Sequence, residues 1–226
     1  MYACRLAVCN CLLILALRSG QAEPRSSLDH ELVVYLRASE AQPAQSAAEM
    51  KREVNESMES AGYSVSWRTV GQSQNEVSGA AVVVVELRGS CRASFEPTQG
   101  VAAATSLGST AVVNGELLPF SWVECGALSR YLSRELARES KNRREFVYGR
   151  AVGRVIAHEL FHVLANTKKH EDWGIGKAAF SARDLLNETF QFEMATRSRI
   201  KSSASVNIAP TANHEESVVD ETVAGR

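Results

Sequence analysis

The chain has 226 residues, of which 45% are hydrophobic and 23% charged, and its formal net charge at pH 7 is −1. A chain of this length and hydrophobic content can bury one sizeable core, so one domain with short appendages is expected. The nearly balanced charge argues against a nucleic-acid partner and against a helix that lies on a membrane surface.

Residues 1–22 have the pattern of a secretory signal peptide. Arg5 supplies the positive charge, residues 6–17 form an apolar run too short to span a bilayer, and Gly20 and Ala22 are the small residues that a signal peptidase requires. We therefore expect cleavage after Ala22, a secreted or periplasmic mature chain, and no stable membrane insertion. The alternative is that the apolar run forms a buried N-terminal helix.

Cleavage would leave two of the five cysteines, Cys91 and Cys125. An even pair in a secreted protein predicts one disulfide. The competing interpretation, thiolate ligands for zinc, is weaker because the two cysteines are isolated and have no C-x-x-C spacing.

The first part of the predicted domain alternates strand and helix. Leu32–Leu36 is typical of a strand, Pro43 suits the start of a helix that Gly62 ends, and 63–70 alternates like a strand. The four valines within 80–87 predict a central strand that is buried on both faces. The order is β-α-β-β, and the helix can cross over between parallel strands.

A hairpin is predicted around Asn114-Gly115, which separates two short apolar runs in 111–118. Pro119 follows in the second arm, and a proline there implies an edge strand or the end of pairing. An exposed sheet edge of this kind would let a peptide add on as a further strand.

Helices dominate the remainder. We predict an amphipathic helix over 128–138, a charged joint over 141–144 and a long helix over 143–165. A capping box formed by Ser181 and Asp184 opens a last helix. Residues 201–226 have no apolar period and are expected to be a disordered tail, which places the domain at 23–200.

The long helix carries the most specific motif, His158-Glu159-Leu160-Phe161-His162. Residues four apart share one face of a helix, so His158 and His162 can both point at one ion, and Glu159 lies beside that face. This H-E-x-x-H arrangement is typical of zinc-dependent hydrolases. The alternative is a buried helix on which two histidines fall four apart by chance.

A hydrolytic zinc site needs three protein ligands and an open position for water. His170 is the favoured third ligand, because Asn166 tolerates the left-handed conformation that ends a helix and the chain can then return to the ion. Glu188 is the rival ligand, since two-histidine-plus-glutamate sites take their carboxylate from a following helix.

The stretch 149–170 resembles the zincin superfamily of metallopeptidases, nearest the metzincins, and 150–184 also resembles uncharacterised secreted bacterial proteins. The resemblance implies an α+β fold with a mixed twisted β-sheet, an active-site helix and a C-terminal helix. The metzincin motif would place glycine at Ala165 and histidine at Lys168, whereas the third histidine here is His170. Met194 is the candidate for the methionine turn of that family.

The resulting hypothesis is a secreted zinc metallopeptidase that hydrolyses a peptide or protein substrate. His158, His162 and His170 would hold Zn²⁺, and Glu159 would act as the general base toward a zinc-bound water. The alternative hypothesis is a secreted zinc-binding or interaction protein without catalysis. The sequence leaves the oligomeric state, the substrate and the oxyanion stabiliser open.

Overall fold

The computed structural model describes residues 30–69, 79–93 and 106–207, with side chains described as far as residue 203. The predicted signal peptide and residues 208–226 of the predicted tail lie outside these ranges. That the mature domain begins at residue 23 therefore stays a prediction.

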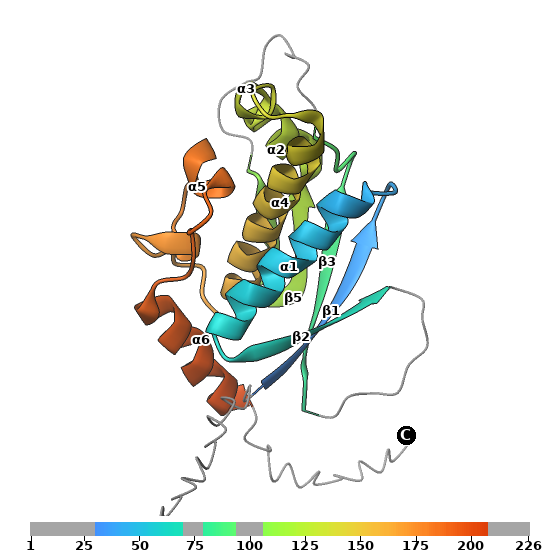
Figure 1. Ribbon diagram of the computed structural model, residues 1–226. Coiled ribbons are helices and arrows are strands. Elements are labelled where there is room, and N and C mark those ends of the chain that lie inside the picture. The colour runs from blue at the N-terminus through green and yellow to red at the C-terminus, as the bar shows by residue number, and fades with distance from the viewer. Residues whose placement is uncertain (1–29, 70–78, 94–105, 208–226) are drawn as a thin grey trace, which may run out of the picture.

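A five-stranded sheet forms the frame of the molecule (Figure 1). Its strands lie in the order β2-β1-β3-β5-β4, and β4 is the one strand that runs antiparallel to its neighbour. The mixture of a mostly parallel sheet with helices is consistent with the predicted α+β class; a zincin-like fold stays a prediction. The bounds are β1 (His30–Ala38), β2 (Tyr63–Thr69), β3 (Ala81–Arg88), β4 (Gly108–Val113) and β5 (Glu116–Glu124).

The predicted β-α-β crossover is confirmed. Helix α1 (Ala44–Ser60) joins the parallel strands β1 and β2, and it ends where Gly62 adopts a φ of +89°. Pro43 is the residue that precedes the helix rather than its first residue. A residue with fixed φ and no N–H donor suits either place, because the first helical N–H groups have no partner inside the helix.

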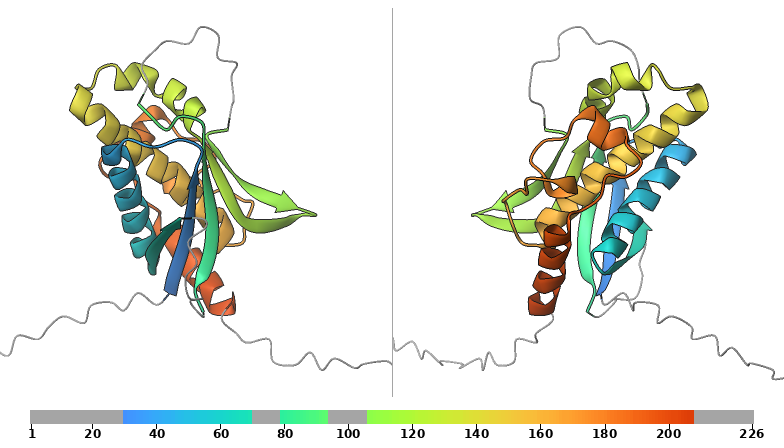
Figure 2. Two further views of the ribbon diagram at one scale, coloured as in Figure 1. Left: turned by 90° about the vertical axis from the view of Figure 1, so that its right-hand side faces the viewer. Right: turned by 60° about the vertical axis from the view of Figure 1, so that its left-hand side comes forward.

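Strand β3 is the central strand, as predicted, but the prediction that both of its faces are buried is wrong. Val83, Val85 and Leu87 are buried, whereas Val82 is 48% exposed. The reason is that α1 and the long helix α4 (Lys141–Leu164) lie on the same face of the sheet (Figure 2). A parallel strand covered on one side alternates between buried and exposed residues.

The predicted hairpin is confirmed, with φ of +51° at Asn114 and +89° at Gly115. The proline-containing arm is not the edge strand, however, because β5 lies between β3 and β4. Pro119 is tolerated because pairing of β5 with β3 begins one residue later, at Phe120, and because the β4–β5 register shifts next to it. Strand β4 is therefore one of the two edge strands of the sheet within the described residues, and β2 is the other.

Close packing of α1 against α4 depends on two glycines. A Cβ on Gly149 would lie 2.3 Å from the Ser46 carbonyl oxygen, and one on Gly153 would lie 2.7 Å from the Met50 carbonyl oxygen. Glycines four apart on α4 therefore let the α1 backbone approach it directly. This approach brings the buried carboxylates of α1 against α4.

The amphipathic helix predicted over 128–138 is divided into α2 (Cys125–Tyr131) and α3 (Ser133–Leu136). Leu128, Leu132 and Leu136 are fully buried, so the predicted apolar stripe is present despite the break. The charged joint is not a separate linker, because Lys141 already begins α4 and Ser140 caps it.

The single last helix that the sequence predicts is two helices, α5 (Ala182–Leu186) and α6 (Met194–Asn207). The predicted capping box of Ser181 and Asp184 is present. The helix stops because Asn187 is extended, and the carbonyls of Leu186 and Asn187 lie 3.2 and 3.4 Å from Nη1 of Arg150. Helix α6 continues to Asn207, past residue 200 where the sequence predicted the domain to end.

Cys91 and Cys125 form a disulfide, as predicted, between the residues that follow β3 and the start of α2. None of the helices in the described ranges combines the length and the apolar character that a bilayer crossing requires.

Candidate metal centre

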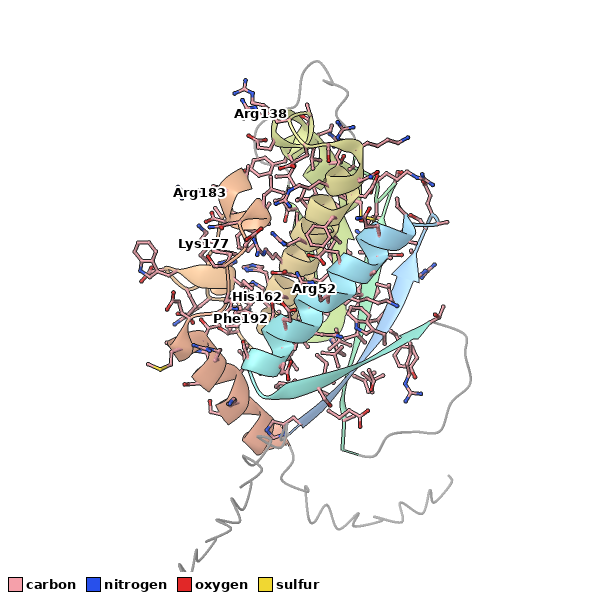
Figure 3. All side chains as sticks on the ribbon, in the orientation of Figure 1. Arg52, Arg138, His162, Lys177, Arg183 and Phe192 are labelled. Carbon is pink, nitrogen blue, oxygen red and sulfur yellow. A yellow bond between two sulfur atoms is a disulfide. The ribbon has the colours of Figure 1, made fainter. Side chains whose placement is uncertain are left out.

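The H-E-x-x-H motif lies in the last two turns of α4, where His158, Glu159 and His162 are all buried. The apolar residues around them on the helix are packed into the core, among them Ile156, Leu160 and Phe161. Figure 3 shows His162 near the end of α4, on the side that faces the C-terminal segment. The burial of the helix removes these side chains from water, so their polar atoms need partners within the protein or in a bound group.

Both motif histidines hold their Nδ1 atom against a backbone carbonyl. Nδ1 of His158 lies 2.7 Å from the oxygen of Ile175, and Nδ1 of His162 lies 2.7 Å from the oxygen of Thr167. A carbonyl oxygen can only accept, so each Nδ1 carries the hydrogen and each Nε2 of a neutral ring carries a lone pair. The two Nε2 atoms are 3.1 Å apart. Two lone pairs at this distance repel one another unless a cation or a proton lies between them.

His170 reaches the same place through a chain reversal after α4. Asn166 has a φ of +43°, which confirms the prediction that it adopts the left-handed conformation, and the N–H of Thr167 donates to the His162 carbonyl. The His170 ring then lies 5.3 Å from the His158 ring and 4.8 Å from the His162 ring. Ligand atoms of the three histidines all lie within 4.8 Å of one another, and the third ring is exposed to solvent.

Electrostatics favours neutral rings at the two buried positions. Burial lowers the pKa of His158 to about 4, although the Ile175 carbonyl opposes this effect. Burial also lowers the pKa of His162, against the opposing effect of the Thr167 carbonyl. A neutral imidazole is the form that binds a metal.

The third polar member of the motif, Glu159, points to strand β4. Its Oε2 accepts a hydrogen bond of 2.8 Å from Oγ1 of Thr110. Burial raises the pKa of Glu159 to about 7, and the Thr110 hydroxyl acts in the opposite direction. A carboxyl with this pKa can both take up and release a proton near neutral pH.

The other residues considered from the sequence lie elsewhere. Glu188 is 72% exposed and its Oε1 is 3.6 Å from Nη2 of Arg143, fifteen residues before His158 on α4 and thus roughly 22 Å away along that helix. The Met194 side chain is 72% exposed at the start of α6.

The turn after α4 does not have the metzincin spacing, because its left-handed residue is one position later and its third histidine two positions later. Ala165 has a φ of −86°, and the left-handed residue is Asn166. Lys168, at the position where that family has histidine, donates from Nζ to the Gly115 carbonyl at the tip of the β4–β5 hairpin. The reversal thus delivers His170 to the site and ties the hairpin to it.

The three imidazoles are a suitable donor set for a divalent metal ion. Zinc–nitrogen bonds of about 2.0–2.1 Å in tetrahedral geometry place two ligand nitrogens roughly 3.3 Å apart, close to the separation of the His158 and His162 Nε2 atoms. The carbonyls that hold Nδ1 act as the outer partners that metal-bound histidines normally have. The ring of Phe180, 5.2 Å from that of His158, forms an apolar wall beside them.

Sequence reasoning missed Thr110 and the carbonyls of Thr167 and Ile175. The carbonyls leave no trace in residue identity, because any residue type supplies one. Thr110 is 49 positions from Glu159, and the hairpin signal predicted its strand without indicating which face would meet α4.

Comparison with known proteins finds no matching protein family and no matching curated protein.

Proposed function

We propose that this chain is a zinc-dependent metallopeptidase of the zincin superfamily, similar to the metzincins but with a late third histidine. The observation that carries the proposal is the convergence of two Nε2 lone pairs, fixed by Nδ1 hydrogen bonds to carbonyls, with the ring of His170. Within the described residues, His158, His162 and His170 are the group suited to hold the ion.

The composition of the site supports a catalytic rather than a structural role. Structural zinc sites are closed by four protein ligands, usually including cysteine, whereas catalytic sites use three and leave one position open. The two cysteines outside the predicted signal peptide form a disulfide and are not ligands. His170 is exposed, so the ion would be bound at a place that solvent and substrate can reach.

Glu159 is the proposed general base. When bound, zinc lowers the pKa of a coordinated water and polarises the scissile carbonyl. Glu159 takes a proton from the attacking water and delivers it to the leaving amine, for which a pKa of about 7 is well placed. Glu159 is buried, which limits the access of bulk water to this carboxylate.

Strand β4 supports a peptide as the substrate. It is one of the two edge strands of the sheet within the described residues, and its Thr110 contacts Glu159. An extended peptide can add to such an edge through backbone hydrogen bonds, which would place its scissile bond beside the general base. Val112 and Val113, 46% and 51% exposed, lie along the same strand.

The Cys91–Cys125 disulfide supports the proposed secreted or periplasmic location. Such bonds persist in oxidising compartments and are rare in the reducing cytosol.

The test is zinc stoichiometry of the purified chain together with cleavage of a mixed peptide library, read by mass spectrometry. We expect one zinc per chain and cleavage that 1,10-phenanthroline abolishes, while the non-chelating 1,7-isomer has no effect. Bound zinc without cleavage would favour a non-catalytic zinc-binding protein. A chain that retains no divalent metal would overturn the proposal.

A further inference from the structure

Strand β4 meets the Glu159 carboxylate at two alternate residues, Gly108 and Thr110. Oγ1 of Thr110 lies 2.8 Å from Oε2, and a Cβ added to Gly108 would lie 2.9 Å from Oε1. Residues two apart on a strand point to the same side, so both face α4. Thr110 thus supplies a hydrogen-bond donor to the carboxylate, and Gly108 leaves space for its Oε1 atom.

The Thr110 hydroxyl is part of a chain of three side chains. Its Oγ1 is 3.0 Å from Oγ of Ser121, which is fully buried on β5. An ionised carboxylate only accepts, so Thr110 donates its single proton to Glu159, and Ser121 must then donate to Thr110. The carbonyl of Glu159, 3.3 Å from the same Oγ1, is a longer, competing acceptor.

We propose that Thr110 is a positioning residue, which fixes the orientation of the Glu159 carboxylate through the hydrogen bond to Oε2. Ser121 orients the Thr110 hydroxyl, and Gly108 provides the room that Oε1 occupies. This inference rests on the proposed function, because it assigns Thr110 a part in the same reaction.

The geometry explains why such an anchor is needed. A glutamate side chain has several rotatable bonds, and a catalytic group misplaced by about 1 Å can lose roughly 100-fold in rate. A charge-assisted hydrogen bond from a strand holds the carboxylate in one orientation. Since β4 is also the proposed edge for the peptide, the same strand would align substrate and base.

Three variants distinguish the effect of the Thr110 hydroxyl from the effects of side-chain shape and of position on the strand. Thr110→Val keeps the shape and removes the hydroxyl, Thr110→Ser keeps the hydroxyl, and Ser109→Ala is the matched control. Ser109 is the neighbour of Thr110 on β4. Its hydroxyl donates to the Gly108 carbonyl and lies near the hydroxyl of Ser106. We expect T110V to lower kcat about 10- to 100-fold with KM and zinc content unchanged, while T110S and S109A stay within about threefold of the wild type. Equal losses in T110V and T110S, or full activity in T110V, would overturn the inference.

A second measurement does not depend on turnover. In the metal-free protein at pH 8, T110V should lower the thermal unfolding midpoint by about 4–10 °C, as expected for loss of a hydrogen bond to a charged group. In a Glu159→Ala background the same substitution should have a clearly smaller effect, because the Glu159 acceptor is gone and only the hydrogen bond from Ser121 is lost. Equal shifts in both backgrounds would overturn the contact. Failure of the wild-type chain to cleave any peptide would contradict the proposed function alone, and the thermal comparison would still decide the role of Thr110.

Discussion

A stripe of four buried polar side chains runs along α4, and its two halves satisfy their buried polar atoms in different ways. Arg150, Arg154, His158 and His162 follow one another at four-residue spacing, and all four are buried. The arginines are neutralised by carboxylates of α1, with Nε of Arg154 2.7 Å from Oε1 of Glu53. The histidines instead donate Nδ1 to carbonyls and turn their Nε2 atoms toward each other.

The difference shows that a buried polar stripe is not in itself a functional site. In the arginine half the protein supplies the partners, and the guanidinium groups also hold the carbonyls of Asp184 and Leu186. In the histidine half the described residues bring three nitrogen ligands together, which suits a cation supplied from outside the chain. We therefore expect substitutions in the arginine half to change stability and those in the histidine half to change metal binding and chemistry.

The largest effect is expected for Glu159→Gln. The amide cannot take a proton from water, so kcat should fall at least about 1000-fold, within the range that general acid–base catalysis contributes. Zinc stoichiometry should be unchanged, because the histidine ligands remain. The matched control is Glu188→Gln, on an exposed carboxylate paired with Arg143. Full activity in E159Q would show that Glu159 is not the general base.

In the arginine half, Arg154→Met should lower the free energy of unfolding by about 3–5 kcal/mol, since it leaves the buried Glu53 without its nearest partner. Arg143→Met, on a half-exposed arginine of the same helix, should cost less than about 1 kcal/mol. Urea denaturation measures both. The division of the stripe would be wrong if R154M unfolded like the wild type but lost its zinc.

The third ligand can be tested by comparing His170→Ala with Glu188→Ala. We expect H170A to weaken zinc binding at least about 100-fold, because even the outer partners of metal ligands are worth about 10- to 100-fold. E188A should leave the affinity unchanged. Competition with a chromogenic chelator gives both constants. The opposite order would move the site to the two-histidine-plus-glutamate type.

Local signals in the sequence were sufficient to predict several features around the histidine site. Four-residue spacing predicted that His158 and His162 share a face, and the tolerance of asparagine for positive φ predicted the reversal at Asn166. Asn114-Gly115 predicted the hairpin in the same way. Each of these features depends on residues close together in the chain.

Features set by distant parts of the chain could not be predicted. The strand position of Pro119, the open face of Val82 and the end of α5 depend on which strands and helices become neighbours. The partners of the stripe show this most clearly, because Glu53 is 101 residues from Arg154. The motif in the sequence singled out the two histidines, but only the tertiary contacts show that the protein itself supplies the partners of the two arginines.

The smallest expected effect concerns the pH dependence of stability in the metal-free protein. The folded Glu159 has a pKa of about 7, raised by burial from its usual value of 4.5. Between these values the folded chain keeps a proton that the unfolded chain has released, so this group lowers the free energy of unfolding as pH rises. E159Q lacks the group and should gain stability relative to the wild type, by up to about 3 kcal/mol between pH 4.5 and 7.5.

The histidines do not obscure this comparison. Burial lowers the pKa of His158 to about 4, so that residue destabilises the fold as pH falls below 6.5, but it does so in both proteins and cancels in the difference. Urea unfolding with a chelator present, at several pH values across this window, measures the difference directly. A constant difference between E159Q and the wild type would mean that the Glu159 carboxylate is not held in an environment that resists its ionisation, and the general base would then lack the proton affinity that its proposed role requires.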